Sequence, residues 1–322
     1  GLAALLRDLF KLYPQATVSS HFLRMRDIQH IGEVPHSVLG RDMLQRKIAT
    51  HDRVDGSARM RGMCLVAFAW NVHPRWRLVM VGNRDEFHAR PTAPLAAWAD
   101  SEVIAGRDLR SGGTWMGLGP RGRVVVITNV RDGLPPAFVG PSRGALPVDF
   151  ISGDAPANAH AASLAAGAAD YAPFNLVLAD AESCAYVGNH PASGAHAVAP
   201  GVHGLSNGAF DAPWPKTRRL RTVLQAWIEA GNDNPAPLWQ ALADERPAPD
   251  AELPETGVGL DLERRLSPAF IRGRDYGTRA STLVLVGHDG ESRIHERRFG
   301  PDGVSAGETV LHGGEESGGA GR

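Results

Sequence analysis

The sequence predicts an α+β fold, in which antiparallel β-hairpins are interrupted by a helical block. Apolar, β-prone runs recur in pairs that are separated only by short turns. Helical spacing appears in separate blocks, so strands and helices do not alternate one by one as they do in βαβ units. No internal repeat of fixed period is present.

The hairpins are the strongest local signal. The first joins its two runs across a turn that contains Pro74, and the second across the segment PRG. The paired runs are 64–70 with 76–83, 114–119 with 123–130, 174–180 with 183–189, and 281–287 with 292–299. A further short strand is expected at 202–207.

Helices are expected at 142–152, 157–170, 213–231 and 237–244. In the third of these, Leu220, Leu224 and Trp227 recur at helical spacing, and Gly231 follows as a stop signal. The Pro-rich stretch 246–257 is predicted to be a loop within the domain or a flap over a site.

Composition excludes several classes of protein. The chain has 322 residues, with 34 Lys and Arg against 35 Asp and Glu, so there is no electrostatic reason to expect nucleic acid as a partner. No apolar run approaches the ~20 residues that span a bilayer. The two cysteines do not make a disulfide framework, which favours a cytoplasmic location. The 13 histidines show no metal-ligand spacing, so no metal site is predicted.

The ends of the chain differ from its middle. Residues 1–62 carry a short amphipathic run followed by polar sequence without steady periodicity. Three interpretations apply: untranslated upstream sequence, a removable pro-segment, or an extra arm. The first is favoured because Met63 is a natural start directly before a strand. The folded domain is therefore expected over 63–310, and the Gly-rich tail 311–322 is expected to be disordered.

Cys64 is the first candidate for chemistry. If Met63 starts translation and is removed, Cys64 becomes the N-terminus. Its thiol, with an ordinary pKa of about 8.5, then sits beside an α-amine with a pKa of about 7.7–8.0 that can act as its base. The alternative is a small buried residue at the start of a core strand.

Four polar residues, Asn83 to Glu86, follow the second predicted strand. They are either a solvated turn or part of a site. A carboxylate there can hold an α-amine, and an arginine can lower the pKa of a thiol by favouring its charged form. Cys184, in the middle of a predicted strand, is expected to be an inert core residue.

These motifs together resemble the NRDE family, which is also named for transport and Golgi organisation proteins. The resemblance rests on MCLVAFAW, GNRDEF, GRDLRSGGTWMGL, VITNVR, SRG, FNLVLAD, GLSNGAFDAPWPK and YGTRASTLVLV, in the family's order over nearly all of residues 63–300. It implies an N-terminal-nucleophile fold, a four-layer α/β/β/α sandwich.

The same order is similar to that of cysteine acylases which cleave bile-salt and penicillin V amides. This resemblance implies a catalytic set that consists of Cys64, Arg84, Asp85, Asn129, Asn207 and Arg279. The wider group separates its Arg and Asp by two residues, whereas these are adjacent, so Glu86 is a rival to Asp85. Two asparagine amides could form an oxyanion hole, where each donor is worth about 3–4 kcal/mol; the alternative for each is a turn residue.

Substrate contacts are predicted for Asn83, Glu86, Arg107 and Trp115. Gly112 and Gly113 permit close backbone approach to a ligand. Trp115 could line a pocket, although packing between the sheets is the alternative. The basic run 216–221 is predicted to be a solvated helix face.

Two function classes follow. The first is a cysteine hydrolase that cleaves an amide or related acyl bond of a small molecule without a cofactor. The second is a non-catalytic protein that binds or traffics haem or lipid on the same scaffold, since the family has been linked to both. The sequence does not specify an oligomeric state.

Overall fold

The computed structural model of the chain describes residues 62–133, 138, 140–231 and 233–313. The predictions for residues 1–61 and for the tail from 314 onward fall outside the described residues. Strand β13 reaches Gly313, three residues into the range expected as tail. None of the helices in the described residues combines the length and the apolar composition of a transmembrane span.

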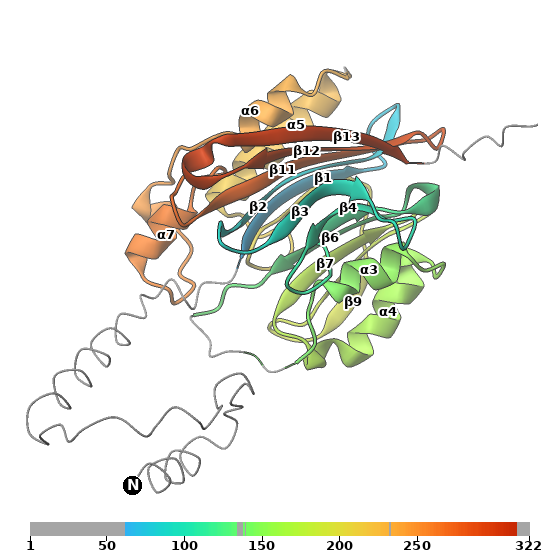
Figure 1. The fold of residues 1–322 in the computed structure, drawn as a ribbon, viewed down its shortest axis with the longest axis horizontal. Helices are drawn as coiled ribbons and strands as arrows, with labels where there is room; N and C mark the ends of the chain where they lie inside the picture. The colour runs from blue at the N-terminus through green and yellow to red at the C-terminus, as the bar shows by residue number, and fades with distance from the viewer. Residues whose placement is uncertain (1–61, 134–137, 139, 232, 314–322) are drawn as a thin grey trace, which may run out of the picture. The chain divides into compact units, whose positions relative to one another are not determined.

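The fold is built on two antiparallel sheets (Figure 1). The first sheet has six strands, in the order β10 (Gly201–Leu205), β1 (Met63–Trp70), β2 (Trp76–Phe87), β11 (Tyr276–Gly287), β12 (Ser292–Phe299) and β13 (Ser305–Gly313). The predicted hairpins β1–β2 and β11–β12 are confirmed. Strands β1, β2 and β11 are buried over nearly their whole length, so they form the centre of this sheet.

The second sheet has seven strands. Their order is β3 (Thr92–Ala97), β4 (Ile104–Asp108), β5 (Met116–Leu118), β6 (Val124–Asn129), β7 (Phe174–Ala179), β8 (Cys184–Gly188) and β9 (Gly194–Ala197). Each strand pairs with its neighbour in sequence, so the sheet is a meander that also contains the predicted hairpins β5–β6 and β7–β8.

Five α-helices occur in the described part of the chain. They are α3 (Ala145–Ile151), α4 (Ala157–Gly167), α5 (Pro215–Glu229), α6 (Ala236–Leu242) and α7 (Leu260–Leu266). Helices α5 and α6 cover the outer face of the first sheet, and α3 and α4 cover the outer face of the second (Figure 1). The sequence predicts the first four of these helices, but not α7.

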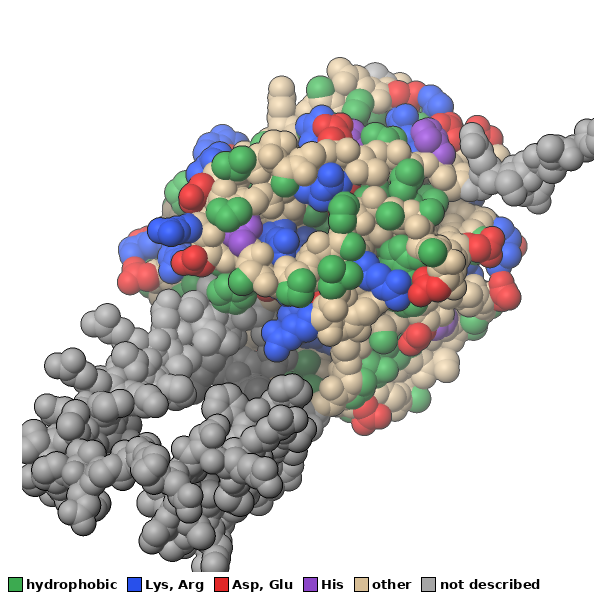
Figure 2. Space-filling view, viewed as in Figure 1, with side chains coloured by type: hydrophobic (Ala, Val, Ile, Leu, Met, Phe, Trp, Pro, Cys, Tyr) green, Lys and Arg blue, Asp and Glu red, His purple; other side chains and the backbone are tan. Residues whose placement is uncertain are grey.

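Three apolar clusters fill the spaces between the layers. One lies between the two sheets and includes Phe68 and Met80. The second packs the first sheet against α5 and α6 and includes Val81 and Leu224. The third packs the second sheet against α3 and α4 and includes Phe150. The predicted α/β/β/α order of layers is therefore confirmed. On the face drawn in Figure 2, basic and acidic side chains are interspersed.

Strand β2 is longer than predicted. It runs to Phe87, so Asn83 to Glu86 lie within the strand and do not form a turn after it. Pairing with β1 on one side and β11 on the other satisfies the backbone of this polar segment. Because side chains alternate along a strand, Asn83 and Asp85 face the helices, and Arg84 and Glu86 face the second sheet.

Gly113 makes a close backbone approach, although to Gly144 and not to a ligand. A Cβ at Gly113 would lie 2.1 Å from the carbonyl oxygen of Gly144, and no side-chain rotation can relieve that contact. We expect Gly113→Ala to lower the free energy of unfolding by about 1–3 kcal/mol in urea titrations. As the control, a Cβ at exposed Gly194 meets nothing within 4 Å, so an equal loss in Gly194→Ala would contradict this explanation.

Candidate active site

Cys64 lies at the start of β1 with its side chain toward the second sheet. The alternation of β1 places it on the same face as Val66 and Phe68, which belong to the cluster between the sheets. Cys64 is 6% exposed, yet it belongs to none of the apolar clusters of the described residues. Cys184, by contrast, is a member of the cluster between the sheets, as its predicted core role requires.

Two asparagines contact the backbone around Cys64. The Cys64 N–H donates to Oδ1 of Asn207 at 3.4 Å, and Nδ2 of Asn207 donates to the carbonyl of Asn129 at 2.8 Å. Nδ2 of Asn129 donates to the carbonyl of Gly62 at 2.6 Å. Ser206 completes the group, because its hydroxyl donates to the Cys64 carbonyl at 2.8 Å. The structure thus brings Cys64, Asn129 and Asn207 together, as predicted.

Charged side chains gather beside Cys64 on the face of β2 toward the second sheet. Arg84 pairs with Cys64 in the strand register, and its Nη2 lies 3.2 Å from Asp108 and 3.6 Å from Glu86. Arg90 pairs with the same two carboxylates. Nη1 of Arg84 is buried and has no hydrogen-bond partner among the described residues.

Arg279 joins this group through an irregularity in β11. The register of β11 against β2 shifts between Thr278 and Ala280, which makes Arg279 a bulged residue. A bulge redirects a side chain. The Arg279 guanidinium donates to the backbone carbonyls of Phe87 and Arg90, and the charge of Arg84 helps to lower its pKa after the larger effect of burial.

Asp85 lies on the other face of β2 from Arg84. Its Oδ1 accepts a hydrogen bond from Oγ1 of Thr278 at 2.6 Å, and its buried Oδ2 has no partner among the described residues. Burial raises the pKa of Asp85 to about 6, against the lowering effects of Lys216 and the Thr278 hydrogen bond. Arg84 and Asp85 therefore approach the start of β1 from opposite sides of the sheet.

Burial also controls the thiol. It raises the pKa of Cys64 to about 12, with Asp85 raising it further and Arg84 lowering it. The predicted direction of the Arg84 effect is present, but burial outweighs it. In a chain where the Cys64 nitrogen is a peptide amide, the thiol therefore stays protonated at neutral pH.

The four predicted substrate contacts have different environments. Asn83 is a packing residue on the helix side, where Nδ2 donates to the carbonyls of Leu242 and Ala269, each at 2.8 Å. Trp115 packs against the clusters on both faces of the second sheet. Arg107 contacts Asp100, Trp98 and Gly112, away from Cys64. Of the four, only Glu86 belongs to the charged group beside Cys64.

The profile of the Transport and Golgi organisation 2 family matches residues 63–301. This chain belongs to that family. The match begins at Met63, one residue before Cys64, and includes every residue of the predicted catalytic set.

Named relatives of the Transport and Golgi organisation 2 family are similar over most of their length. The Bos taurus homolog of Transport and Golgi organization protein 2 is 30% identical over 78% of this chain and 98% of that protein. The Homo sapiens homolog is 29% identical over 77% of this chain and 97% of that protein. The Drosophila melanogaster protein is 27% identical over 72% of this chain and 90% of that protein. Among solved structures, the Caenorhabditis elegans ortholog of N-acylethanolamine-hydrolyzing acid amidase aligns with a TM-score of 0.41 and 11% identity, over 69% of this chain and 92% of that one.

Lys216 is a buried residue near Asp85 that was not among the predicted site residues. The prediction of a solvated basic face over 216–221 is wrong at its start, because Lys216 and Thr217 are buried. Nζ of Lys216 donates to the carbonyl of Leu266 at 2.9 Å. Burial lowers its pKa to about 8, against the raising effect of Asp85. A signal was available, since Lys216 is four residues before Leu220 on the apolar face of the predicted helix.

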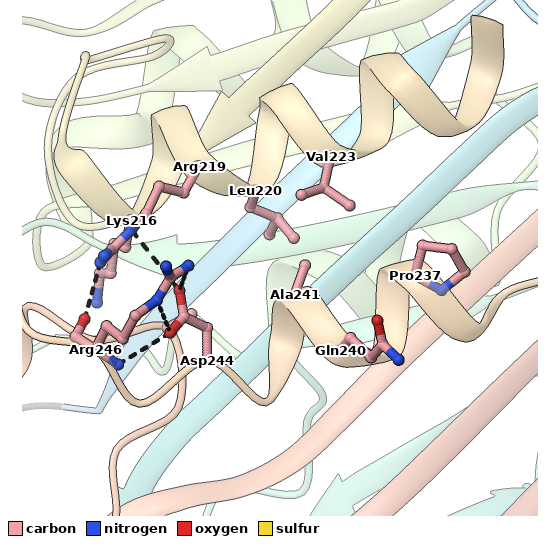
Figure 3. Close-up of a pocket in the computed structure, with 10 residues that line it drawn as sticks. Lys216, Arg219, Leu220, Val223, Pro237, Gln240, Ala241, Asp244 and Arg246 are labelled. Carbon is pink, nitrogen blue, oxygen red and sulfur yellow. Dashed lines mark hydrogen bonds and ion pairs between the residues drawn. The ribbon is translucent and has the colours of Figure 1, made fainter. Parts of the chain in front are cut away.

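Lys216 also lines a cavity of about 420 Å³ between α5 and α6 (Figure 3). Arg219, Asp244 and Arg246 stand at the same end, and Leu220, Val223, Pro237 and Ala241 form the apolar remainder. This cavity lies on the helix side of the first sheet, whereas the Cys64 side chain points to the other face.

The raised pKa of Asp85 predicts a pH dependence of stability. Because the folded state binds this proton more tightly than the unfolded state, the contribution of Asp85 to the free energy of unfolding falls as pH rises from about 4 to about 6, by roughly 3 kcal/mol. Asp85→Asn should therefore gain stability relative to the unaltered protein between pH 4 and pH 7 in urea titrations. A difference between the two proteins that stays constant with pH would contradict the assignment.

Proposed function

We propose that this protein is an N-terminal cysteine hydrolase that cleaves an amide or related acyl bond of a small molecule, with Cys64 as nucleophile. The contact of the Asn129 side chain supports this function best. Its amide already donates to a carbonyl oxygen, that of Gly62, within two residues of the thiol. A substrate carbonyl in that position would receive the same hydrogen bond, which strengthens as the oxygen becomes an oxyanion.

The proposed reaction needs Cys64 to be the first residue. The α-amine takes the thiol proton, sulfur attacks the acyl carbon, and the tetrahedral intermediate collapses with loss of the amine leaving group, which receives that proton. Water then attacks the thioester and releases the acid and the free thiol. A peptide nitrogen cannot act as this base, whereas an α-amine with an ordinary pKa of about 7.7–8.0 can.

The surroundings of Met63 support a role for a freed N-terminus. Asp85 lies opposite Met63 in the register of β1 and β2, and Oδ2 of Asp85 is a buried acceptor without a partner among the described residues. The Met63 N–H donates to the hydroxyl of Tyr276 at 3.0 Å. In a chain without Met63, the Cys64 amine would keep Oδ1 of Asn207 as an acceptor, and the Asp85 carboxylate and the Tyr276 hydroxyl, which face Met63, would become available to it.

Covalent trapping tests the proposal. A chain beginning at Cys64 would be mixed with short-chain acyl amides, esters and thioesters, quenched in acid and digested for mass spectrometry. The expected result is an acyl group on the Cys64 peptide that disappears with time as product accumulates. Absence of both acylation and turnover across the panel would refute the hydrolase.

The burial of Cys64 favours a second candidate, a non-catalytic haem or lipid carrier. A thiol with a pKa raised to about 12 is a poor nucleophile in the chain that retains residue 63. Titration of that chain with haem, followed by the Soret band, tests this candidate. A saturable spectral change that Cys64→Ala abolishes would support the carrier, and an unchanged spectrum would remove haem from consideration.

A further inference from the structure

Lys216 is a buried cation on the inner face of α5. It is the second residue of the helix, 2% exposed, and it shares a face with Leu220 and Leu224, which pack on the first sheet. An ammonium group has three N–H donors. The one hydrogen bond described for it, to the carbonyl of Leu266, leaves capacity for further acceptors.

Asp85 lies on the face of β2 toward the helices, and a chain of contacts leads from it to Lys216. Lys216 donates to the carbonyl of Leu266, Leu266 packs in one cluster with Met63, and Met63 lies opposite Asp85 in the strand register. Each is the charged group that most affects the other's pKa: Lys216 lowers that of Asp85, and Asp85 raises that of Lys216. Oδ2 of Asp85 has no partner among the described residues, so both groups retain unused hydrogen-bonding capacity. Because an isolated buried charge is costly, each makes the other's charged form more favourable.

The arginines around Lys216 and Asp85 are in ion pairs with other carboxylates. Arg84 is on the opposite face of β2, in ion pairs with Glu86 and Asp108. Near Lys216, the buried Arg131 is paired with Glu263. The remaining titratable neighbours, Cys64 and Tyr276, carry no positive charge. Among these cations, Lys216 is thus the one that lies on the same side of the sheet as Asp85 and is not in an ion pair with another carboxylate.

We propose that Lys216 is a positioning residue that holds Asp85 as a carboxylate beside the start of β1, where this carboxylate accepts a hydrogen bond from the α-amine of Cys64. The role of the amine rests on the proposed function. The relation between Lys216 and Asp85 does not, and can be measured without a substrate.

Carboxyl-detected carbon NMR on the full chain tests the relation directly. Asp85→Asn identifies the Asp85 signal, and its pH midpoint is then followed in Lys216→Met and Lys216→Arg. Loss of the cation in Lys216→Met should raise the pH midpoint of Asp85 by at least about 0.5 pH unit. In Lys216→Arg, which keeps the charge, the midpoint should stay close to that of the unaltered protein. As a matched control, Arg219→Met removes a cation one turn further along α5 and should leave the pH midpoint of Asp85 unchanged. An unchanged midpoint in Lys216→Met would overturn the proposal.

Two further measurements separate the possible failures. If Lys216→Met folds poorly, the double variant with Asp85→Asn should melt at a higher temperature than Lys216→Met alone, because it removes the carboxylate whose charge is no longer compensated. A double variant that is no more stable would overturn the proposed relation. If the hydrolase proposal also holds, Lys216→Met in a chain beginning at Cys64 should move the acidic limb of the kcat/KM profile to higher pH. A limb that does not move, in an enzyme that turns over, would reject the positioning role while leaving the hydrolase intact.

Discussion

Replacing Cys64 with alanine in a chain that begins at residue 64 is expected to reduce hydrolysis at least about a thousandfold, because the variant lacks the atom that forms the acyl-enzyme. The Asn129 amide would remain, so a small residual rate from carbonyl polarisation is compatible with the mechanism. The measurement is kcat/KM on whichever amide, ester or thioester acylates the unaltered protein.

The second cysteine of the chain is the matched control. Cys184 is also buried, but it lies in the apolar cluster between the sheets, on β8 of the second sheet. Cys184→Ala should keep kcat/KM within about twofold while losing some stability to the cavity it leaves. Equal activities in Cys64→Ala and the unaltered chain would show that Cys64 is not the nucleophile.

The largest expected effect on stability is at the buried ion pair between Arg131 and Glu263. Both side chains are at most 5% exposed, and Glu263 also accepts hydrogen bonds from the N–H and hydroxyl of Thr256. Glu263→Ala leaves a buried guanidinium without its partner, so we expect the free energy of unfolding to fall by about 3–5 kcal/mol. The backbone N–H of Arg131 donates to the carbonyl of Asn207, which belongs to the candidate site. Activity should therefore fall together with stability.

An exposed ion pair that also involves α7 supplies the comparison. Asp250 pairs with Arg264, and both side chains are about half exposed. Asp250→Ala should leave the urea midpoint nearly unchanged, because water solvates the remaining arginine. If the two substitutions have equal effects, burial is not what makes the Arg131–Glu263 pair important.

The sequence predicts the layers well because the main strands are apolar and strongly β-prone. The runs that become β1, β2, β6, β7 and β11 each have a continuous buried core, which is typical of central strands. Strands β3, β4, β9 and β13 were missed for the opposite reason. They are at or next to sheet edges, and most of their residues are exposed or half-buried, so their sequences carry little apolar pattern.

The candidate site was predicted as a set of residues, but not as a geometry. Period-two alternation separates Arg84 from Asp85 only once the segment is known to be a strand and not a turn. The bulge that turns Arg279 toward Arg84 depends on register, which no local pattern specifies. Lys216 comes from a helix that packs on the far face of the sheet, so its electrostatic influence on Asp85 is a property of tertiary structure.

The first residue of the protein in the cell tests the central claim most directly. Intact-mass measurement of the purified protein, with sequencing of its N-terminal peptide, would identify it. The account predicts a chain that starts at Cys64 with a free α-amine. A protein in which Cys64 is still joined to Met63, and which nevertheless acylates and turns over, would contradict it.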